Sequence, residues 1–190
     1  MNTPYITDAS YKKITFSTPE LQNTEFDTCT FVDCDFTSAY LTSTSFLDCQ
    51  FIDCNFSSAK INDTAFKAVL FSNCKLLGTP FNACNPFLLE MTFKACNLNL
   101  ASFYGIKLKN TVFTDCNLEK TDFTNADLSG ATLANCNLNQ AIFNTTNLEK
   151  ADFSSAKNLT ISPEYNKIKG AKFSKENALG LLTDYKVIIT

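Results

Sequence analysis

A large apolar side chain recurs at every fifth position along most of this 190-residue chain. Fourteen such positions run from Phe16 to Phe81, and each of them is Phe, Leu or Ile. The spacing then shifts by two residues near positions 82–87, and a second set of fourteen runs from Leu88 to Phe153. Because a period of five matches neither an α-helix, at about 3.6, nor a single strand, at about 2, it predicts a coil that turns a corner every five residues.

The residue two places before each large apolar residue is small or slim, and it is most often Cys, Ala or Thr. All nine cysteines occupy this position when Cys84 is counted with the first set. Six of them are spaced by 20 residues, or by 22 across the shift: Cys34, Cys54, Cys74, Cys96, Cys116 and Cys136. This spacing predicts a coil with four sides, each of which points one large and one small side chain inward. The 28 units predict about seven coils, stacked at the strand spacing of about 4.8 Å.

Several of these units match a known consensus. Residues 126–130 (ADLSG), 136–140 (CNLNQ) and 151–155 (ADFSS) resemble the A(D/N)Lxx repeat of pentapeptide-repeat proteins. The resemblance implies an all-β fold, in which residues 14–157 form a right-handed quadrilateral parallel β-helix. The right hand and the square cross-section are implied by the resemblance and do not follow from the periodicity.

The two ends of the chain depart from the clean repeat. A solenoid must protect its ends, so residues 1–13 are expected to form an N-terminal cap that folds Tyr5, Ile6, Tyr11 and Ile14 over the first coil. Residues 158–167 (NLTISPEYNK) predict a loop, because they combine Pro163 with polar residues.

Residues 168–190 predict two final repeats followed by a short C-terminal helix and a strand. Ser174 is the expected N-cap of a helix over residues 175–183, and residues 187–189 (VII) predict the strand. The segment is too apolar to extend free into water. It either caps the last coil or pairs with a second subunit, and the physical argument leaves both alternatives open.

The tail, residues 173–190 (FSKENALGLLTDYKVIIT), resembles the C-terminal segment of Qnr-type gyrase-protecting pentapeptide proteins. In that group the segment forms a two-fold dimer, so the resemblance implies a homodimer through the C-terminus. The residues expected at the dimer or cap contact are Leu179, Leu181, Leu182, Tyr185, Val187 and Ile189.

The composition argues against catalysis and metal binding. The chain has no His, the commonest general base and metal ligand, so none of its cysteines has an activating partner. Thiols stacked one per coil cannot converge in fours on a metal, and they lie side by side rather than facing each other for disulfides. We therefore expect buried free thiols, no enzyme activity, no metal and no cofactor.

The same sequence indicates where the protein acts. No apolar run is long enough to span a membrane, and the N-terminus lacks the apolar core of a signal peptide, so a cytoplasmic location is expected. A net charge of −3 and the absence of Arg argue against direct binding of nucleic acid.

Charge is unevenly distributed along the chain. Eight acids against one lysine give residues 20–63 a local charge of −7, whereas residues 64–114 carry +4 and residues 115–152 carry −4. These charges either keep rods apart in solution or offer a negative surface to a basic partner, and both readings remain open. The candidates for such an acidic partner surface are Asp33, Asp35, Asp48, Asp53, Asp63 and Asp115.

Three functions are compatible with this sequence, and all of them involve a protein partner. The resemblance to Qnr-type proteins implies a DNA-mimicking modulator of DNA gyrase or topoisomerase IV, with quinolone protection as the outcome. The alternative is a generic protein–protein interaction scaffold with a different partner. The third is a structural rod that grows end to end through its C-terminal segment. Direct contact with a membrane is not expected.

Overall fold

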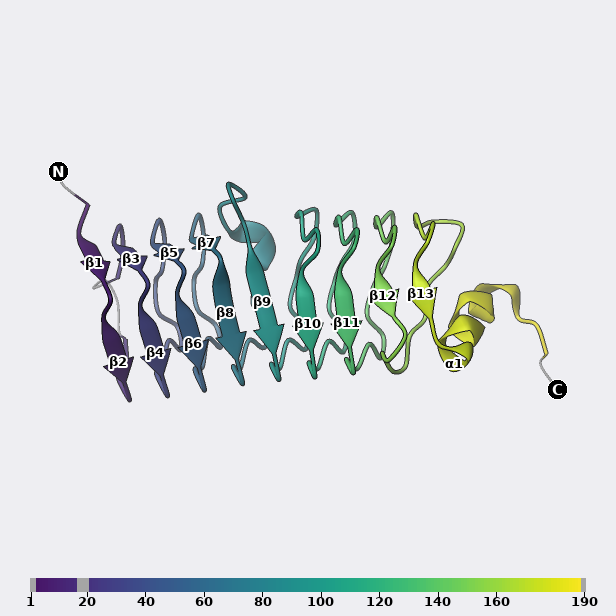
Figure 1. The fold of residues 1–190 in the computed structure, drawn as a ribbon, viewed down its shortest axis with the longest axis horizontal. Helices are drawn as coiled ribbons and strands as arrows, with labels where there is room; N and C mark the ends of the chain where they lie inside the picture. Colours follow the sequence, from purple (N-terminus) through teal and green to yellow (C-terminus); the bar gives the residue numbers. More distant parts are fainter. Residues whose placement is uncertain (1–2, 17–20, 189–190) are drawn as a thin grey trace.

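The structure is a computed structural model that describes residues 3–16 and 21–188. The chain forms a rod of stacked coils, with the two termini at opposite ends (Figure 1). It is a right-handed, four-sided parallel β-helix of about eight turns, with one short helix at the C-terminal end. The predicted fold class is therefore confirmed.

Two parallel sheets run along the rod. The first side of the coil carries a four-stranded sheet made of β1 (Tyr5–Thr7), β3 (Glu25–Asp27), β5 (Ser45–Leu47) and β7 (Ala65–Lys67). The second side carries a nine-stranded sheet made of β2 (Ser10–Lys12), β4 (Thr30–Val32), β6 (Gln50–Ile52), β8 (Val69–Ser72), β9 (Met91–Lys94), β10 (Val112–Thr114), β11 (Thr132–Ala134), β12 (Asp152–Phe153) and β13 (Lys172–Phe173). On the third and fourth sides, successive coils are joined by isolated bridges, such as Asp35 with Asn55 on the third side and Tyr40 with Lys60 on the fourth.

The corners explain why a chain of this composition coils. Residues with positive φ, most often Asn, Asp or Ser, turn the corners. These residue types tolerate the left-handed conformation better than other side chains, because their short polar groups can hydrogen-bond locally. The register is 20 residues where Phe31 pairs with Phe51, and it is 22 where Phe71 pairs with Phe93.

The interior is filled by columns of identical or similar side chains. Phe51 is fully buried and stacks between Phe31, at 4.8 Å between ring centroids, and Phe71, at 5.2 Å. The small residue two places before each large apolar residue fills the core and can also hydrogen-bond to the coil before it. The Cys74 thiol donates to the backbone oxygen of Phe51 at 3.3 Å, and the Thr64 hydroxyl donates to that of Leu41 at 2.8 Å. A small donor at this position therefore ties each coil to the previous one.

The prediction that residues 1–13 form an N-terminal cap is wrong. Residues 5–12 form the first coil, because β1 pairs with β3 and β2 pairs with β4 at the usual 20-residue separation. Tyr11 stacks on Phe31 with ring centroids 5.0 Å apart. Ile6 and Tyr11 continue the five-residue spacing backward from Phe16. The repeat thus begins earlier than predicted, and the rod has about eight turns where the sequence predicted seven.

The repeat is interrupted after a short 3-10 helix, η1 (Phe81–Ala83), by a segment that we call the bulge, Asn85–Glu90. The Asn85 amide donates to the oxygen of Thr64, and the Glu90 amide donates to that of Phe66, both at 3.0 Å. Thr64 and Phe66 are two residues apart on the coil beneath, whereas Asn85 and Glu90 are five residues apart, so the bulge contains additional backbone. The additional backbone loops outward, and among the described residues the first side has no strand after β7 (Figure 1).

The C-terminal segment packs on the last coil. Helix α1 (Lys175–Leu179) begins after Ser174, whose hydroxyl accepts from the Asn177 amide at 3.0 Å, so the predicted N-cap is present. Asn177 is buried and donates to the oxygens of Phe153 and Ala156 at 2.9 and 2.8 Å.

The rest of the segment differs from the prediction. The α-helix ends at Leu179, and residues up to Tyr185 form the 3-10 helix η2 (Gly180–Tyr185). Val187 and Ile188 form no strand, and Ile189 lies outside the described residues. Helix α1 follows β13 directly and η2 continues from it, so the chain leaves the sheet after Phe173. No helix in the described part of the chain is long and apolar enough to cross a lipid bilayer.

Candidate functional site

The six predicted acids lie on the outside of the rod but do not form one patch. Asp33 and Asp53 follow the paired strands β4 and β6 at the same corner, beside Asp35 on the third side. Asp115 occupies that corner after β10, four strands further along the sheet than β4. Asp48 and Asp63 turn other corners, at the two edges of the first side. The structure therefore brings together only the first three.

Several of these carboxylates are also structural. Asp33, Asp48, Asp53, Asp63 and Asp115 all have positive φ, so each turns a corner of the coil. The Asn85 amide group donates to Asp63 Oδ1 at 2.9 Å, and the Asn135 amide group donates to Asp115 Oδ1 at 3.1 Å. Such bonds hold these outward side chains in fixed positions relative to the next coil.

The same ladders continue along the C-terminal half. Asn137 Nδ2 donates to Asn117 Oδ1 at 3.1 Å on the third side, and Asn147 Nδ2 donates to Asp127 Oδ1 at 3.0 Å on the first side. Asp127 also accepts from the Ser129 backbone at 3.1 Å and pairs with Lys109 at 3.4 Å. Burial raises the pKa of Asp127, but these bonds and the nearby ammonium group outweigh it, so the net pKa is lowered.

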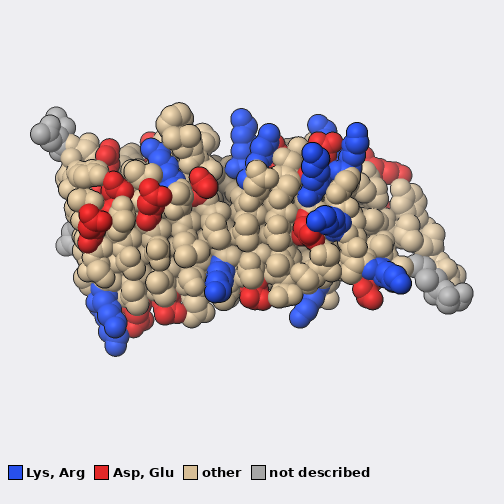
Figure 2. All heavy atoms as spheres, in the orientation of Figure 1, with Lys and Arg blue, Asp and Glu red and all other residues tan. Residues whose placement is uncertain are grey.

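Charge on the first side changes sign along the rod. Its N-terminal coils carry the acids Asp8, Glu25, Asp27 and Asp48 at the surface. Its later coils carry Lys107, Lys109, Lys150, Lys167 and Lys169, interrupted by Asp127 and Glu149. Figure 2 shows acids gathered over the N-terminal coils and lysines along the upper edge of the C-terminal half. Glu20, which the sequence analysis counted with the acidic third, lies outside the described residues.

Hydrogen bonding fixes the acidic end as well. The Tyr5 hydroxyl donates to Asp27 Oδ2 at 2.6 Å, and the Thr28 hydroxyl donates to Asp27 Oδ1 at 2.9 Å. These two bonds lower the pKa of Asp27 below its usual value. The carboxylate of Asp27 in turn raises the pKa of Tyr5.

The second side contrasts with the first, because its strands between the two ends of the rod are almost uncharged. From β4 to β11 its strands carry one charged residue, Lys94. Their outward positions include half-buried or exposed apolar side chains, namely Val32, Ile52, Leu70 and Val112. From β4 to β11 the rod thus presents a charged side next to a nearly neutral one.

The bulge is the feature that the sequence analysis misread. Leu88 was predicted to point inward, but its side chain is 64% exposed, and that of its neighbour Phe87 is 67% exposed. Met91, two places before Phe93, resumes the inward positions. A signal was present, since the residue two places before Leu88 is Pro86 and not the small residue that the repeat requires.

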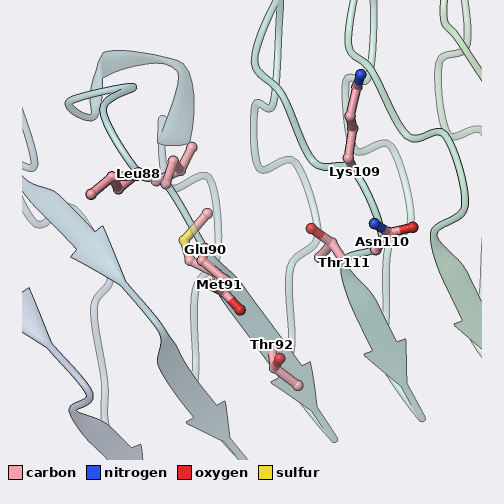
Figure 3. Close-up of a pocket in the computed structure, with 8 residues that line it drawn as sticks. Leu88, Glu90, Met91, Thr92, Lys109, Asn110 and Thr111 are labelled. Atoms are coloured by element: carbon pink, nitrogen blue, oxygen red, sulfur yellow. The ribbon is translucent and has the colours of Figure 1, made fainter.

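Two hollows flank strand β9 beside the bulge. One, of about 400 Å³, lies between Leu88–Thr92 and Lys109–Thr111. Figure 3 shows this hollow, with Leu88 and Glu90 on one wall and Lys109, Asn110 and Thr111 on the other. The second, of about 290 Å³, lies between Ala68–Leu70 and Glu90–Thr92. Both are open surface hollows.

The thiols are packed in the interior. All nine cysteines are buried and free, as the sequence predicted. Burial raises the pKa of Cys49 to about 12, which suppresses the reactive thiolate form. Among residues 3–16 and 21–188, no three His, Cys, Asp or Glu side chains are arranged to hold a metal ion.

The predicted C-terminal contact residues are largely exposed. Leu181 packs against the core, whereas Leu179, Leu182, Tyr185 and Val187 are exposed. The Tyr185 hydroxyl donates to Glu164 Oε1 at 3.1 Å, and this bond raises the pKa of Tyr185. The segment thus touches the last coil and still presents apolar side chains outward.

A rod with a filled interior and an ordered polar exterior defines a repeat protein of the β-solenoid class. A family model described as the pentapeptide repeat region matches residues 5–81, 44–123 and 80–153. The chain therefore belongs to the pentapeptide-repeat family.

Two solved structures illustrate how far the similarity extends. Full-length QnrB1, a plasmid-mediated fluoroquinolone resistance protein, is 17% identical, with 96% of this chain and 100% of that chain covered and a TM-score of 0.41. HetL, a pentapeptide-repeat protein involved in heterocyst differentiation regulation in the cyanobacterium Nostoc sp. strain PCC 7120, is 14% identical, with 90% and 87% covered and a TM-score of 0.49. At these identities the likeness concerns the fold alone. A search of curated proteins finds no match.

Proposed function

We propose that this protein acts without catalysis, as a rigid rod that binds a protein partner through its outer surface. The observation that carries the proposal is the fixed exterior, in which side chains such as Asn137 and Asn147 are hydrogen-bonded to the coil before. A surface that is ordered before binding loses little conformational entropy when a partner docks. All nine cysteines are buried, so none of them offers a thiol at the surface for chemistry.

Affinity capture with the full chain from cells of its source organism tests this function. A partner that binds directly and saturably, as purified protein, is the expected result. Failure of every captured protein to bind directly would contradict the proposal. The matched comparison is the same rod with Asp33→Asn, Asp35→Asn and Asp53→Asn, because these acids lie together and face outward.

A second candidate is modulation of a type II topoisomerase, DNA gyrase or topoisomerase IV, by mimicry of DNA charge. The observation that favours it is the acidic N-terminal third, with a local charge of −7 over residues 20–63. A basic surface built for the DNA backbone would attract this end of the rod. The lysines of the later coils restrict the mimicry to the N-terminal third.

A supercoiling assay with gyrase and a fluoroquinolone tests this candidate. We expect the full chain to alter supercoiling or drug inhibition, and the triple Asp33, Asp35 and Asp53 variant to lose the effect. Asp115→Asn is the matched control, because it removes an acid from the same corner outside the acidic third. No effect of the full chain at micromolar concentration would exclude this candidate and leave the binding rod standing.

A homodimer through the C-terminal segment is part of the same proposal. Exposed Leu179 and Leu182 on the terminal helices supply apolar surface for a two-fold contact. Sedimentation should give a dimer mass for the full chain and a monomer mass for Leu179→Glu with Leu182→Glu. Leu100→Glu, at an exposed leucine in the middle of the rod, should remain dimeric. A monomeric full chain would contradict dimerisation and leave the segment as a cap, and a series of growing masses would favour the end-to-end rod.

A further inference from the structure

The bulge exposes two large apolar side chains next to each other at the middle of an otherwise regular rod. Phe87 and Leu88 are each about two-thirds exposed, at 67% and 64%. Leu88 also has a φ of 53°, a left-handed conformation that costs free energy for a residue with a branched side chain. Most other corners are turned by residues that tolerate this conformation, so the leucine at position 88 is not explained by stability.

The bulge is held rigidly in place. Asn85 donates from its side chain to Asp63 Oδ1 and accepts from the Phe87 amide, both at 2.9 Å. The Glu90 amide is bonded to the coil beneath, and the Glu90 oxygen accepts from the Val69 amide at 3.0 Å. The ring of Pro86 restricts its own φ, directly before Phe87. The exposed pair is therefore presented by a fixed backbone, and both side chains lie in solvent.

The surroundings of this pair are basic. Lys67, on strand β7 just before the bulge, places its ammonium nitrogen 5.7 Å from the centre of the Phe87 ring. Lys107 and Lys109 belong to the next coil of the same side, and Lys109 lines the hollow beside Leu88 (Figure 3). Lys109 pairs with Asp127, but Lys67 and Lys107 form no ion pair with a described residue. An uncharged projection stands between charged groups at the upper edge of the rod in Figure 2.

We propose that the bulge is the anchor by which this rod holds an acidic protein segment that carries apolar side chains. The inference rests on the proposed protein-binding function and names the chemistry of the partner. The apolar side chains of the segment pack on Phe87 and Leu88 and enter the adjoining hollow of about 400 Å³. Its carboxylates face Lys67, Lys107 and Lys109 on either side of the bulge. Aromatic and apolar anchors ringed by complementary charge are the usual centre of such an interface.

Two other occupants fit the observations less well. A second copy docked bulge to bulge would bring the lysines of one rod against those of the other, and like charges in contact oppose association. Single-stranded nucleic acid needs several aromatic platforms and a continuous basic groove. Here Phe87 is the one aromatic residue of the bulge, Glu90 adds a negative charge, and the chain as a whole carries −3.

Selection of random linear peptides displayed on phage, against the full chain, tests the proposal. The peptides recovered should be rich in Asp or Glu and in Phe, Leu or Trp. Their affinity should fall at least roughly tenfold for the double variant Phe87→Ser with Leu88→Asn, as expected when a hot spot is removed. Leu100→Asn is the matched control, since Leu100 is also an exposed leucine with positive φ, at a corner away from the bulge, and its affinity should stay unchanged.

A second set of variants tests the proposed contact between the lysines and the carboxylates of the bound segment. Lys67→Glu with Lys107→Glu should weaken the same peptides about tenfold and reduce the salt dependence of binding. Lys60→Glu, on the fourth side, should leave both unchanged. Thermal unfolding of every variant checks that the fold is kept, which is expected because these side chains lie outside the core.

Several outcomes would overturn the inference. Selected peptides that bind the bulge variants as well as the parent would remove the bulge as anchor and leave the binding rod standing, whereas failure to select any peptide would count against both. A dimer that dissociates in the Phe87 and Leu88 variant would make the occupant a second copy. Binding of a single-stranded oligothymidine that the same variant abolishes would make it a nucleic acid.

Discussion

The coils before the bulge and the coils after it have similar interiors and different exteriors. On the first side, Phe26, Phe46 and Phe66 are followed after the bulge by Leu108, Leu128 and Leu148, and all six are buried. Outside, the earlier coils pair as strands and carry acids. The later coils of the same side are joined by isolated bridges and carry lysines.

The second side shows why this change does not break the rod. Its nine strands run past the bulge without interruption, and Phe71 stacks on Phe93 with ring centroids 5.3 Å apart. The additional residues are accommodated around the bulge, where they displace backbone outward from the first side. A solenoid can therefore alter one side while the columns of the other sides remain continuous, because each coil contacts only its neighbours.

The largest expected effect compares the phenylalanine columns of the two halves. Phe51→Ala should lower the free energy of unfolding by about 3–5 kcal/mol, because a fully buried ring with stacked neighbours on both sides is lost. Phe113→Ala should cost less by about 1 kcal/mol, since Phe113 stacks on Phe93 but is followed in its column by Leu133. Urea denaturation of both variants measures the difference, and equal losses would show that the halves are energetically alike.

The next effect concerns the C-terminal end. A Cβ at Gly180 would lie 2.0 Å from the oxygen of Leu159, so Gly180→Ala should lower the free energy of unfolding by about 1–3 kcal/mol. It should also expose residues 175–185 to protease before the rod unfolds. Gly105→Ala has open space around its Cβ and a strained φ of +70°, so it should destabilise without that early cleavage. Identical digestion patterns for the two variants would argue that the segment is not held against the coil.

A smaller effect with opposite signs separates the bulge from the regular coil. Leu88→Asn should raise the free energy of unfolding by about 0.5–1 kcal/mol, because asparagine tolerates the left-handed conformation and little buried area is lost. The same substitution at Leu108, a buried position one coil later, serves as the comparison and should lower the free energy of unfolding. Thermal unfolding compares the two, and a loss of stability at position 88 would place that side chain in the core.

The smallest effect is a pH dependence in the later coils. Hydrogen bonds from the Ser154 hydroxyl and backbone, followed by the Lys172 ammonium, lower the pKa of Asp152. A carboxyl with a lowered pKa in the folded state stabilises fully above its unfolded value, and this stabilisation is lost as pH falls through the folded value. For this partly exposed group the loss should be a few tenths of a kcal/mol below about pH 4. Asp152→Asn should remove that acid-side slope, and an unchanged slope would assign it to other carboxyls.

Much of the fold followed from local pattern, and the failures have identifiable causes. Phe31, Phe51 and Phe71 were predicted to point inward, because any closed coil must bury a residue repeated at this spacing. Leu88 was misplaced because the spacing alone cannot show where additional backbone loops out. Residues 1–13 were predicted to form a cap because only Ile6 and Tyr11 precede Phe16 at the five-residue spacing, and the pairing of β1 with β3 and of β2 with β4 identifies them as part of the repeat.

The candidate surfaces were less predictable than the core. The acids of the N-terminal third were visible as a charge run, but their distribution over separate corners was not. In the sequence, Phe87 and Leu88 only mark a shift of the five-residue spacing, and it is the structure that shows both side chains exposed.

The five-residue pattern of large and small side chains, together with the 20-residue spacing of six cysteines, was enough to predict a coil of four five-residue sides with a filled interior, because only inward positions must repeat. Tertiary structure alone decided which outward side chains become neighbours, since residues about 20 apart meet only after the coils have stacked. It also decided the course of the bulge and the seat of the terminal helix, because both depend on backbone contacts with another coil, such as that of Gly180 with Leu159.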